Sequence, residues 1–324
     1  MWLKVIILVV VCGFFPLKSY ALACTVVPAK PDITFPAISP LTTGDIETNN
    51  KFDYTCTRGI LEQLLTAATL CFNIYATGTS TISTRKMTLT SGSATLNYQL
   101  YQNTGGVNPW GNQDAAGSTY PYVRITGLNL APATGSFTIY GRIPGGQKTT
   151  PPGTYKDSYT SVTAKITANT DLLLPVSSCG TTTVGSFAFD VTATVNKQCN
   201  VGKAKDINLT DIDHTQTNIP GSTSFTIACT YTTPYSIGLS TTNGSTTGSG
   251  NMKSNTTGNT DQVPYQLYST SGTNGVVWGN IISTNTISGV GTGLDVSRNI
   301  YVIVPGANYK PDTYADTVTI NVTY

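Results

Sequence analysis

The segment Tyr98-Gln99-Leu100-Tyr101 is repeated without change as Tyr265-Gln266-Leu267-Tyr268, and this repeat decides the fold. Four further matches occur around it, in the same order in both halves of the chain: Phe52 to Cys56 with Phe225 to Cys229, Trp110-Gly111-Asn112 with Trp278-Gly279-Asn280, Ile139-Tyr140 with Ile300-Tyr301, and Thr154 to Asp157 with Thr313 to Asp316. Matches in one shared order indicate two homologous domains. The spacing between matches is longer in the first half, so we expect inserted loops there.

The composition indicates a β protein. Charged residues make up only 10% of the chain, whereas Gly, Thr, Ser, Asn and Tyr are frequent, and this balance favours strands and turns over helical bundles. Apolar residues alternate from Leu96 to Leu100 and from Val318 to Val322, as in strands with one buried face. We therefore predict an all-β chain of two immunoglobulin-like β-sandwiches. The exception is Ile60 to Leu70, whose spacing predicts a short helix.

The N-terminus has the layout of a secretory signal peptide. Lys4 is followed by an apolar run from Val5 to Phe15 and by Ala21-Leu22-Ala23. The run is shorter than the roughly 20 residues of a membrane-spanning helix. We expect cleavage near Cys24, with a signal peptide at 1–23 and domains at 24–185 and 186–324. The net charge of +2 offers no basic face for nucleic acid.

The cysteines predict disulfides. Six remain once Cys12 leaves with the signal, and an even number in an exported chain indicates a disulfide framework. A metal site is the alternative, but there is no CxxC pair and His214 is the only histidine, so we expect no metal and no cofactor. The repeat aligns one cysteine pair with another and leaves two cysteines over in the first copy. The predicted bridges are Cys24–Cys56, Cys199–Cys229 and Cys71–Cys179.

The ordered motifs resemble the spore coat protein U domain, the subunit family of archaic chaperone–usher pili. The resemblance rests on the early cysteine pair, the Trp-Gly segment, the Ile-Tyr then Pro-Gly step and the closing Thr-Tyr-x-Asp before an alternating strand, and it covers nearly the whole mature chain twice. A two-domain member resembles the tip adhesins of these pili, in which the N-terminal domain binds a surface and the C-terminal domain joins the fibre.

The resemblance implies three protein partners, namely a periplasmic chaperone, an outer-membrane usher and the next pilus subunit. It also implies export through the periplasm to the cell surface and a position at the pilus tip. There the protein would attach to abiotic or host surfaces and promote biofilm formation.

The second domain is expected to be incomplete. An immunoglobulin-like sandwich needs about seven strands, and the second copy stops at Tyr324, at the end of the alternating run from Asp316. We expect an exposed edge that another chain fills by β-augmentation. Because Cys24 lies at the expected mature start, we expect the chain to accept a strand and not to donate one. The predicted acceptor residues are Val318, Ile320, Val322 and Tyr324.

A second alternating segment lies between the domains. Its apolar residues would all face one way and are Phe187, Phe189, Val191, Ala193 and Val195. Shaft subunits of the family resemble it at their N-termini, where it is the donor strand. Here it either completes the first domain or begins the second, and the sequence favours neither.

The candidate adhesive residues are apolar and lie in loops of the first domain, because exposed apolar patches mark interaction sites. They are Ile60, Leu61, Leu64, Leu65, Val107, Pro109, Leu128, Leu130 and Pro132. The alternative for Ile60 to Leu65 is a cap over the end of the core. Trp110 and Trp278 occur in both copies and are expected in the cores, as are Tyr101 and Tyr268.

Three other functions are alternatives to adhesion. A coat protein of a spore or cell shares the domain, more often in one copy. An enzyme would need paired carboxylates or an activated nucleophile, and His214, between Asp211 and Asp213, has no serine motif beside it, so no enzyme is expected. A carbohydrate-binding lectin of the same fold would use exposed loop residues such as Tyr120, Tyr122, Asn103 or Asp114.

Overall fold

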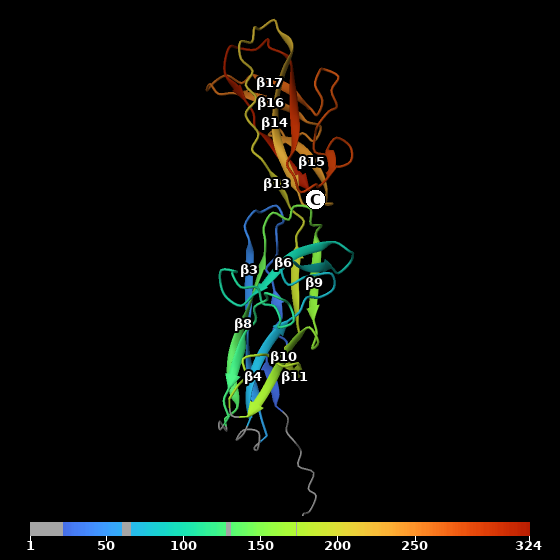
Figure 1. The fold of residues 1–324 in the computed structure, drawn as a ribbon. Helices are drawn as coiled ribbons and strands as arrows, with labels where there is room; N and C mark the ends of the chain where they lie inside the picture. The colour runs from blue at the N-terminus through green and yellow to red at the C-terminus, as the bar shows by residue number, and fades with distance from the viewer. Residues whose placement is uncertain (1–21, 60–65, 128–130, 173) are drawn as a thin grey trace, which may run out of the picture.

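The computed structural model describes residues 22–59, 66–127, 131–172 and 174–324, and Figure 1 shows them as two β domains placed end to end. Every regular element in these ranges is a strand, and no described helix is long and apolar enough to cross a membrane. The predicted all-β class is confirmed.

The first domain forms an eight-stranded sheet with the order β1-β3-β8-β6-β5-β9-β12-β2 and a four-stranded sheet with the order β11-β10-β4-β7. Its strands are β1 (Ala23–Val27), β2 (Ile33–Thr34), β3 (Ile46–Thr57), β4 (Thr66–Ile74), β5 (Arg85–Leu89), β6 (Thr95–Tyr101), β7 (Tyr122–Ile125), β8 (Ala133–Ile143), β9 (Gly153–Tyr159), β10 (Ala164–Leu172), β11 (Thr182–Ser186) and β12 (Phe189–Val195).

The second domain repeats this arrangement with fewer strands. Its sheets have the orders β13-β14-β19-β17-β16-β20 and β18-β15-β21, which match β1-β3-β8-β6-β5-β9 and β7-β4-β10. Among the described residues it has no counterpart of β2, β11 or β12. Its strands are β13 (Cys199–Val201), β14 (Thr217–Cys229), β15 (Pro234–Thr241), β16 (Ser249–Ser254), β17 (Gln262–Tyr268), β18 (Ile287–Val290), β19 (Val296–Gly306), β20 (Tyr314–Ala315) and β21 (Val318–Thr323).

Matching side-chain contacts show that the two domains share one fold. Both tryptophans are fully buried, as predicted, and each donates from Nε1 to a carbonyl of the facing sheet: Trp110 to Phe72 at 2.8 Å, and Trp278 to Ile237 at 2.9 Å. In both domains a tyrosine hydroxyl also donates to the aspartate of the Thr-Tyr-x-Asp motif. Two expected core residues are only half-buried, namely Tyr101 and Tyr268.

The segment between the domains belongs to the core of the first. All five of its alternating apolar residues, from Phe187 to Val195, are at most 2% exposed and lie in the first domain's cluster. Phe187 stacks on Phe52, with ring centroids 5.0 Å apart. The segment therefore completes the first domain's core, which is one of the two options that the sequence left open.

The predicted helix is wrong over its described part. Thr66 to Leu70 form the start of β4, which pairs with β10, and Ile60 to Leu65 lie outside the described residues. β4 is buried on both faces, because residues 174–181 contact Thr69 and Cys71 on its outer side, and Gln113 and Thr167 contact Asn73. A strand buried on both faces has a continuous apolar run, and periodicity alone does not separate such a run from a helix.

The three disulfides are Cys24–Cys56, Cys199–Cys229 and Cys71–Cys179, the pairs that the repeat predicts. Two of them join the first strands of each domain, across 32 and 30 residues of sequence. In the chain-entropy model, loops of this length stabilise a fold by about 3 to 4 kcal/mol. The third ties β4 to the segment that leads into β11.

We predict that Phe187→Ala destabilises the first domain by about 3 to 5 kcal/mol, because it removes a fully buried aromatic ring and leaves a cavity. Denaturant unfolding followed by tyrosine and tryptophan fluorescence would measure this. Thr194→Ala on the exposed face of β12 is the matched control, with an expected change within about 0.5 kcal/mol. Equal effects of the two substitutions would contradict the placement of β12 in this core.

Candidate strand-acceptor edge and distal surface

The segments β11 and β12 form the last strand of the first domain and cover a sheet edge there. The equivalent edge of the second domain has no described strand along it. β11 pairs with β10, and β12 pairs with β9 over seven residues from Tyr159↔Phe189 to Gly153↔Val195. In the second domain β21 pairs only with β15, and β20 pairs only with β16, among the described residues. We call the free sides of β20 and β21 the acceptor edge.

Burial at equivalent positions shows what the missing strand leaves exposed. Ile166 and Ala164 of β10 are fully buried. Their partners on β4 align with Ile237 and Leu239 of β15, so the equivalent residues of β21 are Val322 and Ile320. Both are only half-buried, although they pack against the second core. The same sandwich therefore has a closed edge in one domain and an open edge in the other.

The residues on the other side of the last strand's position differ in burial in the same way. In the first domain, Ile33 and Phe35 pack over Gly141 and are buried, and β2 pairs with β12 in parallel. In the second domain, Ile207 and Leu209 pack over Gly221 of β14, whose partner Val302 takes the place of Gly141, and both are half-buried. These two residues form the far wall of the gap that a last strand would fill.

The predicted acceptor residues are placed as follows. Val318, Ile320 and Val322 face the second core from β21, whereas Tyr324 is 53% exposed beyond the strand's end. Reasoning from the sequence missed β20 and the wall of Ile207 and Leu209. The repeat contained a signal for β20, since Tyr314 occupies the place of the fully buried Tyr155 and makes the same hydrogen bond to a carbonyl four residues earlier.

A charge cluster holds β12 in the first domain. Asp190 accepts hydrogen bonds from Lys30 Nζ at 2.8 Å and from Ser158 Oγ at 2.7 Å, and Lys156 Nζ lies 3.1 Å away. Burial alone would raise the pKa of Asp190, but these partners outweigh it and lower the pKa to about 2. The cluster links β12 both to β9 and to the loop before β2.

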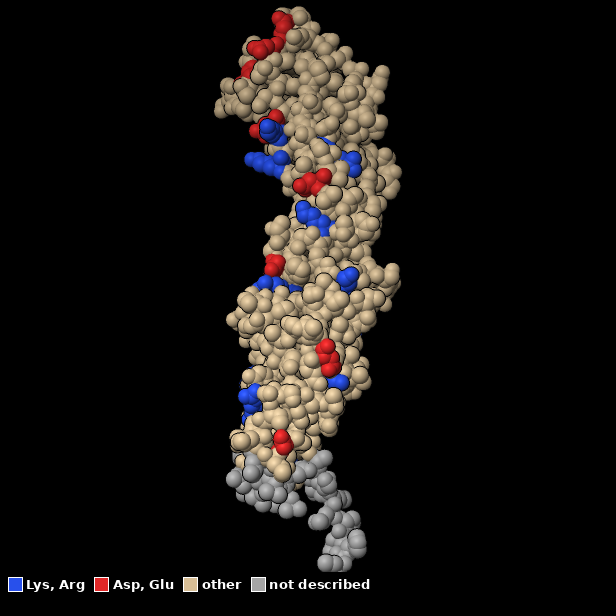
Figure 2. All heavy atoms as spheres, viewed as in Figure 1, with Lys and Arg blue, Asp and Glu red and all other residues tan. Residues whose placement is uncertain are grey.

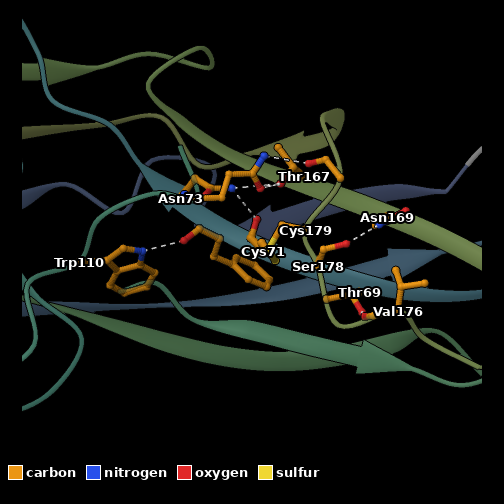
Figure 3. The surroundings of a disulfide bond; sticks show 12 residues. Thr69, Cys71, Asn73, Trp110, Thr167, Asn169, Val176, Ser178 and Cys179 are labelled. Carbon is orange, nitrogen blue, oxygen red and sulfur yellow. Dashed lines mark hydrogen bonds between the residues drawn. A yellow bond between two sulfur atoms is a disulfide. The ribbon is translucent and has the colours of Figure 1, made fainter. Parts of the chain in front are cut away.

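A strap of residues 174–181 connects β10 to β11, and the described residues of the second domain contain no counterpart of it. Figure 3 shows its disulfide from Cys179 to Cys71 of β4, with polar side chains around it. Asn169 Nδ2 donates to Ser178 Oγ at 3.0 Å, and Gln113 Nε2 donates to the carbonyl of Gly180 at 3.0 Å. The strap therefore fixes the chain at the point where it turns into its last strand.

The distal surface is the end of the first domain away from the second, where β10 ends (Figure 1). Its described apolar residues include Leu172 and Leu174, which are 70% and 73% exposed, and the exposed Pro132. Strand register brings them to one end, because Leu172 pairs with Thr66 at the start of β4, and β8 begins directly after Pro132.

The other predicted adhesive residues are not all found there. Val107 is 75% exposed and Pro109 half-buried, but both follow Tyr101, which pairs with Tyr140 in the half of β8 away from Pro132. They therefore lie on the side of the domain. The remaining candidates lie outside the described residues: Ile60, Leu61, Leu64, Leu65, Leu128 and Leu130.

The residues considered for a lectin are partly engaged elsewhere. Asp114 accepts a hydrogen bond from Tyr75 at 2.6 Å, and the side-chain oxygen of Asn103 is buried. Tyr120 is half-buried, whereas Tyr122 is 56% exposed with the Arg124 guanidinium over its ring. Figure 2 shows few charged side chains, scattered over a mostly uncharged face of the molecule.

These features define a class of protein: two β-sandwich domains of one fold, of which the first has its last strand and the second has no described strand along the same edge. The chain belongs to the Spore Coat Protein U domain family, whose model matches residues 17–163 and 186–321. The predicted family is confirmed. No curated protein matches the chain.

Solved structures of pilus subunits resemble the chain. A chain of the CsuC–CsuE chaperone–tip adhesion subunit pre-assembly complex, from the archaic chaperone-usher Csu pili of Acinetobacter baumannii, aligns with 93% of this chain and 100% of its own, at a TM-score of 0.52 and 17% identity. The CupB6 tip adhesin from Pseudomonas aeruginosa aligns with 94% of this chain and 95% of its own, at a TM-score of 0.40 and 10% identity. The first likeness shows the fold, and the predicted pair of immunoglobulin-like domains is confirmed.

We predict that Asp190→Asn destabilises the first domain by about 1 kcal/mol near neutral pH. Because folding lowers the pKa of Asp190 from 3.8 to about 2, the charged carboxylate stabilises the fold above pH 4, and this stabilisation is lost as the pH falls from 4 to 2. Urea unfolding of both proteins at several pH values would test it. The two stability curves should converge at the acid end, and a constant difference between pH 7 and pH 2 would contradict the assignment.

Proposed function

We propose that this protein is the tip adhesin of a chaperone–usher pilus. Its second domain is completed by a strand from the periplasmic chaperone and then from the next subunit, and its first domain attaches to a surface. The observation that supports this most directly is the acceptor edge on β20 and β21, in a chain whose other domain has the same edge covered. A partner strand would add to the sheet by β-augmentation.

The first domain gives the size of the stabilisation that such a strand provides. The five side chains from Phe187 to Val195 are almost completely buried. At about 1.5 to 3 kcal/mol for each large apolar side chain, a strand of this kind contributes on the order of 10 kcal/mol before ordering costs. A joint between subunits would need no covalent bond.

The family match supports the same arrangement. The second match begins at residue 186, so Phe187 to Val195 stand at the start of the second family unit in sequence. In the structure they complete the first unit instead. The strand at the start of the second family unit thus completes the first unit within the same chain. Because Phe187 to Val195 already fill the first domain, they are not free to complete another subunit. This supports a terminal position in the fibre.

The distal surface is the proposed adhesive site. Leu172 and Leu174 are mostly exposed at the end farthest from the acceptor edge, and exposed apolar residues in a soluble domain mark interaction sites. The low content of charge, 10% of residues, favours attachment to apolar abiotic or host surfaces, on which biofilms would form.

We predict that Val322→Asp and Ile320→Asp each reduce capture by a co-expressed periplasmic chaperone at least about tenfold. Each places a carboxylate where a donor strand would exclude water, and 1.4 kcal/mol already corresponds to tenfold. Affinity purification of the tagged chaperone would measure capture. Thr319→Asp, on the exposed face of the same strand, is the control and should keep capture. Undiminished capture of both variants would rule out this edge as the acceptor.

We predict that the double variant Leu172→Asp, Leu174→Asp lowers retention on polystyrene at least about tenfold, because each exposed leucine contributes up to about 1.5 to 3 kcal/mol when covered. Retention of purified protein after washing is the measurement. Val162→Asp is the matched control, since Val162 is 70% exposed but lies in the turn between β9 and β10. Retention that free sugar abolishes, and that the double variant keeps, would favour a lectin instead.

A further inference from the structure

The first domain shows which features a strand needs in order to fill this site. β11 passes over Cys24, one half of the Cys24–Cys56 disulfide, at Gly185. A Cβ atom on Gly185 would lie 2.6 Å from the carbonyl oxygen of Cys24 and 2.9 Å from its Cβ atom. Contacts this short are not tolerated, and one of them is to backbone, which cannot rotate away. The strand therefore needs a glycine where it crosses this disulfide.

The same crossing exists in the second domain. Cys199 pairs with Cys229 on β13 and β14 in the register of Cys24 with Cys56, and the Cα atoms are 4.0 Å apart in both bridges. In the first domain, Gly185 pairs with Ile166, whose equivalent on β21 is Val322. A strand added beside Val322 would therefore pass over the second disulfide as closely as Gly185 passes over the first.

The next residue of the strand whose side chain points into the core is aromatic. Phe187 follows the glycine by two residues, stacks on Phe52 and lies 6.2 Å from Trp110, centroid to centroid. The second domain repeats this floor with Phe225 and Trp278, both at most 2% exposed and 6.3 Å apart. An aromatic side chain at this position would rest on the same pair of rings.

We propose that the strand which completes the second domain carries a glycine opposite Val322 and an aromatic residue two positions later, in the pattern of the chain's own Gly185-Ser186-Phe187. This rests on the proposed function and adds the specificity of the acceptor edge: the disulfide Cys199–Cys229 selects the glycine, and Phe225 with Trp278 selects the aromatic ring. A peptide with the sequence of Thr182–Val195 is then itself a ligand of the second domain. The first domain, already closed, binds none.

The test uses the full chain and a synthetic peptide of residues 182–195. We expect native mass spectrometry to show one peptide bound per chain, and fluorescence anisotropy to show binding that the chain variant Val322→Asp loses. The peptide with Gly185→Val should bind at least about tenfold more weakly, as should the peptide with Phe187→Ala. The peptide with Ser186→Val, changed between these two positions, is the matched control and should bind as well as the parent peptide.

The outcomes separate this inference from the proposed function. Equal binding of the parent and Gly185→Val peptides would overturn the glycine requirement while leaving the acceptor edge in place. No binding of the parent peptide, together with chaperone capture that depends on Val322, would overturn the shared pattern alone. Failure of both peptide binding and chaperone capture would overturn the proposed function as well.

Discussion

Whether an edge strand is paired along the sandwich decides how completely the core of each domain is buried. Where β11 and β12 lie along β10 and β9, the residues beneath them are fully buried, and β9 extends over seven residues. Where no described strand lies along β21 and β20, the equivalent residues are half exposed, and β20 shortens to two residues. Because the remaining strands, apart from the short β2, have the same order in both domains, the comparison shows how the last strand affects burial in an immunoglobulin-like core.

The repeat and the alternating runs were enough to predict two β-sandwiches and their disulfides. They could not decide where Phe187 to Val195 belong, because an amphipathic strand has the same sequence pattern whichever core it packs on. Local sequence also misled at Thr66 to Leu70, where burial of both faces of β4 removed the alternation that indicates a strand. Such errors arise wherever tertiary contacts, and not the strand itself, decide which face is buried.

The candidate site was only partly predictable for a related reason. The free edge of β21 followed from counting strands in the second copy, but its other wall, Ile207 and Leu209, has no strand pairing and a weak pattern. It becomes visible only beside the buried Ile33 and Phe35 of the first domain. Strand register also places Val107 on the side of the domain. The position of a loop along the domain depends on the register of its strands and not on its composition.

The two ways of completing a domain suit the two proposed tasks. The first domain keeps its last strand through the chain itself. The Cys71–Cys179 bridge holds the chain ahead of β11, and the Asp190 cluster holds it near the start of β12. A strand connected in this way competes with any free strand at a high effective concentration. The described residues of the second domain contain no such disulfide or charge cluster beside the acceptor edge. Their absence suits the proposed exchange of one partner strand for another.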